Sequence, residues 1–217
     1  MFDTEYGIAS LVLKEIPYKG AAYIILREVW DAEKLLKECV SFCKMCGAER
    51  IFAAGHESLE SYPLYTSVLE MRGEATVDRE NLKSLFPVTE ATVSQWRAIY
   101  NEKMGSVDNA ATMTARDEKW ILQSGGAYFV HESGELLGIG WLEDTDLLAV
   151  AAVKPGAGKT VMNTLMSLIE GAQMRLEVAS TNEKAIHLYE KMGFFKINAL
   201  RHWYIVDQAC NRETPVL

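Results

Sequence analysis

The sequence is poor in cysteine and proline, with four and five of these among its 217 residues. Three of the cysteines, Cys39, Cys43 and Cys46, recur at the spacing of one helix face, which is typical of small, partly buried groups. A metal site would need further ligands, and the remaining cysteine, Cys210, is distant in the sequence. We therefore expect no metal site.

Positive charge and long apolar runs are also lacking. The 30 Asp and Glu residues outnumber the 22 Lys and Arg residues, so the formal net charge is −8. This balance argues against nucleic acid or an anionic membrane as the main partner. No apolar run is long enough to span a bilayer, and Met1–Glu5 has no basic segment followed by an apolar one. We expect a cytoplasmic protein.

The chain does contain enough apolar residues, 49%, to bury a substantial core. Its most informative stretch begins with the apolar run Leu147–Val153, which predicts a buried strand. Gly156 and Gly158 then permit a tight turn, and the apolar spacing of Val161–Ile169 predicts a helix. Free N–H groups and the positive end of the helix dipole meet at such a turn, which suits a phosphate.

A second strand and a second helix follow this turn. Met174–Ala179 predicts the strand, Thr181 or Asn182 can cap the helix, and Gly193 can end it. Asn182 and Tyr189 are seven residues apart, so they project from one helix face. On the residues alone, Asn182 could be only a cap, Tyr189 only a packed aromatic, and the glycines only an ordinary strand-to-helix turn.

The pattern Asn182-x-x-Ala-Ile-x-Leu-Tyr-Glu-Lys-Met-Gly-Phe194, together with the glycine turn, resembles the acyl-CoA-dependent N-acetyltransferase (GNAT) superfamily. The resemblance implies that Tyr189 protonates the departing thiolate and that Asn182 contacts the pantetheine arm of acetyl-CoA. It also implies that the strand Ala151–Val153, hence Ala151 and Val153, pairs with that arm. The coenzyme A pyrophosphate would lie on the backbone amides of the turn, which consists of Gly156, Ala157, Gly158, Lys159 and Thr160.

The turn departs from the family pattern. The family has Gln or Arg three residues before the first glycine, where this chain has Val153, and the loop is about three residues short. Lys159 could supply the missing charge, as a single ammonium group rather than the bidentate guanidinium of an arginine. Gly158-Lys159-Thr160 also resembles the end of a nucleotide-binding P-loop, but that pattern needs a glycine where Val153 stands.

The N-terminal part shows a similar order of elements. The patterns predict a strand at 21–29, a helix at Asp31–Cys46, a strand at Arg50–Ala54 and a helix at Ser58–Met71. Gly47 and Tyr65 each precede a matching residue, Gly171 and Tyr189, by 124 positions, which suggests a decayed half-repeat. Its turn, Trp30–Glu33, has two carboxylates and no glycine pair, so we expect it to bind no cofactor.

We therefore predict a degenerate, partial GNAT-like unit at 1–77 and a GNAT domain at 85–207. The second unit would have an α/β fold with a mixed sheet, the acyl-CoA N-acyltransferase fold. Its other predicted elements are strands at Leu85–Val88, Ala127–His131, Leu136–Leu142, Phe194–Leu200 and His202–Val206, and helices at Thr89–Lys103 and Asn109–Ser124.

The resemblance implies an N-acetyltransferase that moves an acetyl group from acetyl-CoA to a primary amine of a small molecule or peptide. We expect direct attack in a ternary complex, because no cysteine or serine nucleophile lies near the motif. Glu143, Asp144 and Asp146 are candidate general bases. The alternative is a non-catalytic acyl-CoA-binding or protein-interaction module on the same fold. A homodimer is possible, and the sequence leaves the oligomeric state open.

Overall fold

A computed structural model describes residues 1–208, and these form two compact units. Unit 1 consists of Met1–Ser67 with the C-terminal segment from Arg201, and unit 2 consists of Val68–Leu200. The sequence predicted units at 1–77 and 85–207. Cys210 lies outside the described residues. Within residues 1–208 no helix is both long enough and apolar enough to cross a bilayer.

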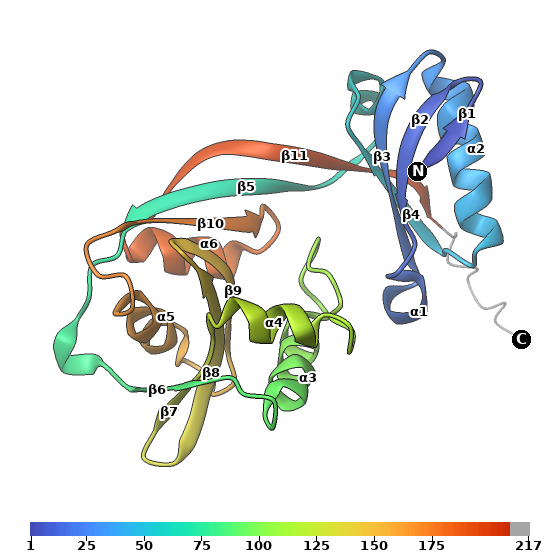
Figure 1. Ribbon diagram of the computed structural model, residues 1–217. Coiled ribbons are helices and arrows are strands. Elements are labelled where there is room, and N and C mark those ends of the chain that lie inside the picture. The colour runs from blue at the N-terminus through green and yellow to red at the C-terminus, as the bar shows by residue number, and fades with distance from the viewer. Residues whose placement is uncertain (209–217) are drawn as a thin grey trace, which may run out of the picture. The chain divides into compact units, whose positions relative to one another are not determined.

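Unit 1 is a five-stranded sheet with one long helix on one face (Figure 1). Its strands lie in the order β1-β2-β3-β4-β11, and only the β3–β4 pair is parallel. The elements are β1 (Phe2–Thr4), β2 (Gly7–Val12), α1 (Ile16–Lys19), β3 (Ala21–Val29), α2 (Ala32–Met45), β4 (Arg50–Ala54), η1 (Glu57–Ser61) and β11 (Phe195–Gln208).

The helix α2 has the sequence signals expected of it. Asp31 caps it by accepting a hydrogen bond from the Lys34 N–H at 3.1 Å, and Gly47 follows its end with φ of 91°. Cys39 and Cys43 are fully buried in the core beneath it, while Cys46 is exposed. Burial raises the pKa of the Cys39 thiol to about 12 and that of Cys43 to about 11. Both thiols are therefore inert packing groups.

The prediction of a helix at Ser58–Met71 is wrong. A single 3-10 turn, η1, is followed by the strand β5 (Leu64–Glu74). Pro63 precedes the strand, and Tyr65-Thr66-Ser67-Val68 favours extended backbone over helix. The stacking of the Tyr65 ring on Phe52, 4.1 Å between centroids, belongs to unit 1. Tyr65 therefore lies on a strand, whereas Tyr189 lies on a helix, so the two positions do not match in secondary structure.

Unit 2 is a six-stranded mixed sheet in the order β5-β10-β9-β8-β7-β6. The β9–β10 pair is parallel, and the neighbouring pairs are antiparallel. Its elements after β5 are η2 (Arg79–Asn81), β6 (Ser84–Pro87), α3 (Val93–Met104), α4 (Glu118–Ser124), β7 (Ala127–Glu132), β8 (Glu135–Glu143), β9 (Asp146–Ala152), α5 (Gly158–Met166), β10 (Gln173–Ala179) and α6 (Glu183–Lys191).

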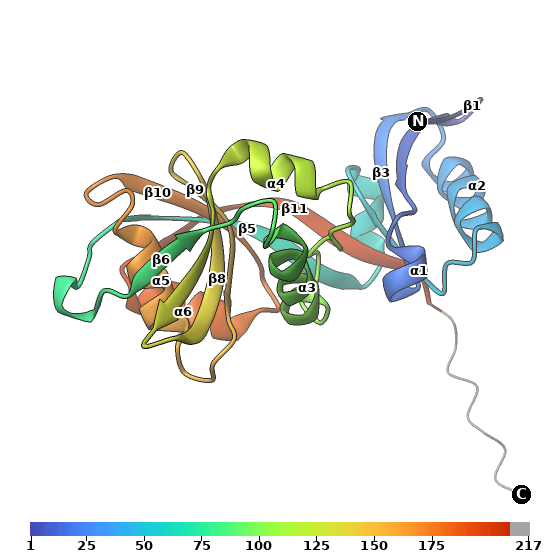
Figure 2. The same cartoon turned by 60° about the horizontal axis from the view of Figure 1, so that its bottom comes forward.

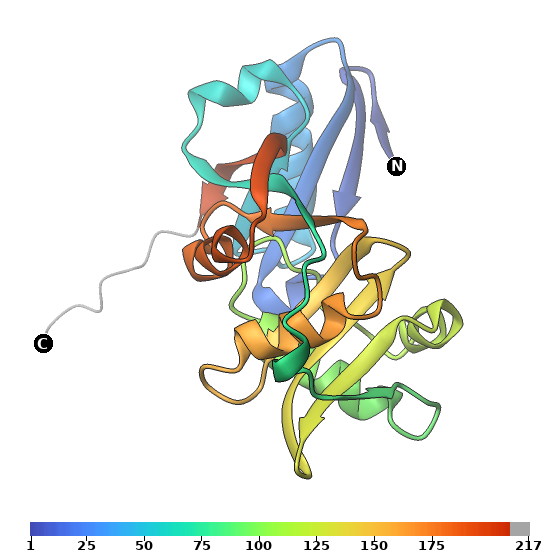
Figure 3. The ribbon, with the colours of Figure 1, turned by 90° about the vertical axis from the view of Figure 1, so that its left-hand side faces the viewer.

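The two faces of this sheet are covered by different pairs of helices. Neighbouring residues of β7 point to opposite faces, so Val130 joins the core under α5 and α6, whereas Phe129 joins the core under α3 and α4. Figures 2 and 3 show α4 and α5 on opposite sides of the β7–β9 strands. The approach of α5 is close: a Cβ at Gly140 would lie 2.1 Å from a Leu165 methyl carbon. The mixed α/β prediction is confirmed.

Two further boundaries differ from prediction. Only Glu118–Ser124 of the expected helix 109–124 is helical, because side chains hold the preceding backbone in another shape. The Asn101 amide bonds both backbone groups of Met113 at 2.8 Å, and Asp117 accepts the Thr114 N–H at 2.6 Å. The two expected closing strands are instead one continuous strand, β11.

Candidate active site

The parallel strands β9 and β10 separate soon after they meet. Their pairing covers two residue pairs, Arg175 with Asp146 and Leu176 with Leu147. Beyond these pairs, β9 remains bonded to β8, as in the pair Ala151–Ile139. The edge of β9 that faces β10 is therefore left open, with its backbone groups exposed to whatever enters the gap.

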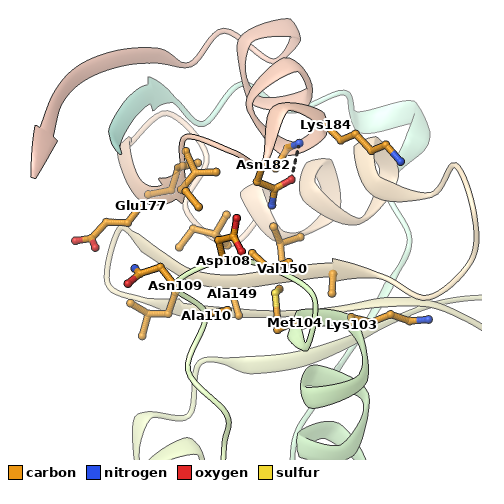
Figure 4. Close-up of a pocket in the computed structure, with 18 of the residues that line it drawn as sticks. Lys103, Met104, Asp108, Asn109, Ala110, Ala149, Val150, Glu177, Asn182 and Lys184 are labelled. Atoms are coloured by element: carbon orange, nitrogen blue, oxygen red, sulfur yellow. Dashed lines mark hydrogen bonds between the residues drawn. The ribbon is translucent and has the colours of Figure 1, made fainter. Parts of the chain in front are cut away.

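A pocket of about 600 Å³ occupies this opening (Figure 4). Its floor is β9, where Ala149, Ala151 and Ala152 keep the passage wide because their side chains are small. The first turns of α6, the last turn of α3 and the loop that follows α3 complete the walls. All of the lining residues belong to unit 2.

Tyr189 reaches this pocket from α6. It is 7% exposed, and its hydroxyl has no hydrogen-bond partner among residues 1–208. Burial raises the pKa of Tyr189 to about 12, so the hydroxyl keeps its proton throughout the neutral range. A protonated hydroxyl that lines a pocket and has no partner among the described residues is suited to donate a hydrogen bond to a ligand.

Asn182 stands at the start of α6 and also lines the pocket. Its side-chain oxygen accepts a hydrogen bond from the Ala185 N–H at 3.3 Å, so the predicted capping role is present. Its amide nitrogen points away from this bond and toward Val150 (Figure 4). The same side chain can therefore cap the helix and donate to a ligand.

The glycine turn connects β9 to α5 at the end of the pocket. Gly156 has φ of 82°, which favours glycine, and Gly158 packs so close to α6 that a Cβ would lie 3.3 Å from Leu188. No side chain caps α5, and the N–H groups of Gly158, Lys159 and Thr160 have no acceptor within the described chain. The helix thus begins with free donors and the positive end of its dipole.

The predicted site residues fall into two groups. Ala151, Gly158, Asn182 and Tyr189 line the pocket. The others form the turn beside it; they are Val153, Gly156, Ala157, Lys159 and Thr160. The Val153 N–H donates to the Leu137 carbonyl at 2.8 Å, so it is turned toward β8. None of the described residues forms a cluster of three or more His, Cys, Asp or Glu side chains suited to a metal ion.

The three predicted bases do not line the pocket. Glu143 and Asp144 line a second hollow, and Asp146 pairs with Arg175 at 3.2 Å. The pocket instead contains Asp108 and Glu177, which sequence reasoning missed.

These two carboxylates are held in different ways. The Thr181 hydroxyl donates to Asp108 at 2.7 Å, and Arg175 pairs with Glu177 at 2.6 Å. The alternation of Glu177 with the buried Leu176 and Val178 on β10 was the available signal for its orientation. Asp108 gave no such signal, because its position depends on an irregular loop.

Comparison with known proteins agrees with this geometry. Residues 93–194 match the model of the acetyltransferase (GNAT) family. Residues 93–194 belong to the GNAT family. The match spans α3 to α6 and so contains nearly the whole pocket. No curated protein matches the chain.

Several solved structures share the fold. A GCN5-related N-acetyltransferase from Sphaerobacter thermophilus is 12% identical with a TM-score of 0.53, and the alignment covers 91% of this chain and 76% of that one. One from Kribbella flavida is 10% identical with a TM-score of 0.54, covering 85% and 50%. A protein from Pyrococcus horikoshii is 13% identical with a TM-score of 0.57, covering 94% and 71%. At these identities the likeness establishes the fold alone.

Proposed function

We propose that this protein transfers an acetyl group from acetyl-CoA to a primary amine by direct attack in a ternary complex. The observation that carries the proposal is the buried Tyr189 side chain, whose hydroxyl has no partner among residues 1–208, in a pocket that opens between two separating parallel strands. An extended thioester arm fits such an opening, because the unpaired edge of β9 offers backbone groups and Ala149 and Ala151 leave room.

The residues present suit coenzyme A. The free N–H groups at the start of α5 would hold its diphosphate, and the open edge of β9 and the Asn182 amide would hold its pantetheine arm. When bound, acetyl-CoA supplies the acetyl group: the amine nitrogen bonds to the thioester carbonyl carbon as the carbon–sulfur bond breaks. The pocket's role in this step is to align the two reactants.

Tyr189 serves as the proton donor to sulfur. Its hydroxyl first donates a hydrogen bond to the departing thiolate and then gives up its proton. The raised pKa of about 12 makes Tyr189 a weak acid. The same burial disfavours a bare thiolate, so it lessens the difference in pKa between the tyrosine hydroxyl and the thiol. The substrate ammonium loses two protons in all: one is released to water and the other replaces the proton of Tyr189.

Glu177 is the carboxylate we assign to the first of these proton transfers. It lines the same pocket as Tyr189 and is about half exposed, so it can pass a proton to water. It also adds negative charge to the pocket wall, which favours a cationic amine as the acceptor. The ion pair with Arg175 fixes the direction of its side chain.

The proposal is tested by titrating the purified protein calorimetrically with acetyl-CoA and then measuring thiol release with a panel of primary amines. We expect binding in the micromolar range and amine-dependent release. The Glu177→Gln variant should bind acetyl-CoA as the wild type does and lose roughly 100-fold in kcat, with its activity partly restored at higher pH, where more of the amine is already neutral.

Glu143→Gln is the matched control, because Glu143 does not line the pocket. Binding without turnover for any amine would favour a non-catalytic acyl-CoA-binding module. Absence of binding to either coenzyme A or acetyl-CoA would refute both readings.

A further inference from the structure

The charged side chains of the pocket are separated by sign. In Figure 4 the Glu177 carboxylate lies at the left and that of Asp108 near the centre, whereas the side chains of Lys103 and Lys184 extend to the right. The pocket therefore has an acidic portion and a basic portion. An amine suits the acidic portion, and the basic portion suits an anion.

Lys184 is positioned beside the start of α5. It precedes Leu188 by four residues on α6, so the two side chains share a helix face. Leu188 in turn contacts Gly158, the first residue of α5. The lysine is thus one helical turn along α6 from the residue that packs against the start of α5. No carboxylate among the described residues lies within ion-pair distance of Lys184.

Lys103 approaches the pocket from the last turn of α3. Its ion-pair partner is the adjacent Glu102 at 2.8 Å, and that carboxylate is 70% exposed. A pair between neighbouring, solvent-screened side chains contributes little free energy, so Lys103 can exchange it for a ligand at small cost. Lys159, in the first turn of α5, resembles Lys184 in having no ion-pair partner within residues 1–208.

We propose that Lys184 and Lys103 bind the phosphate groups of coenzyme A, and that they replace the charge missing from the shortened glycine turn. The inference rests on the proposed function, because it names the residues that hold the same co-substrate. Each lysine contributes a point charge to phosphate oxygens that the amides of α5 orient. The diphosphate and the 3′-phosphate have the same chemistry, and the experiment separates them.

The test is calorimetric and needs no turnover. Coenzyme A, 3′-dephospho-coenzyme A and pantetheine are titrated into the wild type and into Lys184→Gln, Lys103→Gln and the double variant. Each single change should weaken coenzyme A binding about three- to fivefold, and the double change about tenfold, because both contacts are partly solvated. Pantetheine, which has no phosphate, should bind all four proteins equally. The difference between variants should shrink in 0.5 M salt.

Two variants serve as controls. Lys191→Gln removes the same charge from α6, and Lys119→Gln removes it from α4, in both cases at a position that does not line the pocket. Both should bind coenzyme A as the wild type does. If the loss persists with 3′-dephospho-coenzyme A, the lysines contact the diphosphate; if it disappears, they contact the 3′-phosphate. Either pattern supports the proposal.

Two results would overturn it. A wild type that binds coenzyme A, with lysine variants that bind it equally well, removes this inference and leaves the proposed acetyltransferase intact. A wild type that binds neither coenzyme A nor acetyl-CoA removes the proposed function and this inference with it. Circular dichroism spectra and melting temperatures of the variants exclude a loss of folding as the cause of weaker binding.

Discussion

The two units contain the same three successive elements, and they differ at the two places that create a site. In unit 1, β3, α2 and β4 form a strand, a helix and a parallel strand; in unit 2, β9, α5 and β10 do the same. Gly47 and Gly171, 124 residues apart, stand before the second strand of each set with φ of 91° and 79°. A common origin for the two sets remains a prediction.

The first difference is in strand pairing. The strands β3 and β4 pair in register from Ala21 with Arg50 to Ile25 with Ala54, so no gap opens between them. The strands β9 and β10 separate after two pairs, and the pocket lies in the opening. Continuous pairing of two strands satisfies the backbone N–H and C=O groups on their facing edges. Separation of the strands leaves these groups free to bond a ligand.

The second difference is at the helix start. In unit 1 the Asp31 carboxylate lies at the beginning of α2 and accepts a hydrogen bond from the Lys34 N–H, so an anion is already present there. In unit 2 no side chain among residues 1–208 caps α5, and its first N–H groups have no acceptor in that range. The same strand–helix unit is therefore either closed by its own carboxylate or left open for a phosphate.

Replacement of Tyr189 by Phe should give the largest effect. The ring and its packing against Phe194 are kept, but the proton donor is lost, so kcat should fall about 100-fold while the affinity for acetyl-CoA changes less than twofold. Steady-state kinetics and calorimetry measure the two quantities. The matched control is Tyr65→Phe. Tyr65 lies at the start of β5, in the part of that strand that belongs to unit 1, so the change should leave kcat unchanged.

The alkaline side of the pH profile sharpens this test. Because the pKa of Tyr189 is raised to about 12, its ionisation cannot reduce kcat between pH 8 and 10. A loss of kcat in that range that disappears in Tyr189→Phe would contradict the assignment of a protonated Tyr189. Equal kcat in the wild type and the variant would remove its role as proton donor altogether.

The substitution Lys159→Glu makes the start of α5 resemble that of α2. A carboxylate in the first turn interacts well with the helix dipole but repels a diphosphate, so coenzyme A affinity should fall about tenfold without loss of thermal stability. Lys159→Gln should give a smaller loss, and pantetheine binding should be unchanged in both. Unaltered coenzyme A affinity in Lys159→Glu would mean that the diphosphate does not lie at this helix.

The features that the sequence predicted well are local. The Asp31 cap, the helix after it, the glycine turn and the capping side chain of Asn182 all depend on residues within one or two turns of each other. The motif around Tyr189, from Asn182 to Phe194, is also local, and for that reason it pointed to the family from the sequence alone.

The features that were missed depend on contacts distant in sequence. The strand β5 was predicted as a helix because its partner, β10, lies about 100 residues later, and the pairing decides its shape. Glu177, Lys103 and Asp108 come from a strand, a helix and a loop, and only the fold brings them into one pocket. The residues 109–117 were predicted as helix because the side chains that prevent it, such as Asn101, act from another element.

The smallest effect is expected for Asp31→Asn, which opens the helix start of unit 1. Loss of the negatively charged cap should lower the melting temperature slightly and leave coenzyme A binding unchanged, because the β3–β4 pair remains closed. Hydrogen bonds from Lys34 lower the pKa of Asp31 below its usual 3.8, so the ionised form is the one that the folded state prefers. Its contribution is therefore fully present above pH 3.8 and is lost as the pH falls through the lowered value.

Urea unfolding of wild type and Asp31→Asn between pH 3 and pH 6 measures this contribution. The difference between the two midpoints should be constant from pH 6 down to about pH 4 and should narrow below that as the wild-type carboxylate is protonated. A difference that grows on acidification would contradict the sign of the linkage. New coenzyme A binding in the variant's unit 1 would show that the carboxylate alone, and not strand pairing, separates the two units in function.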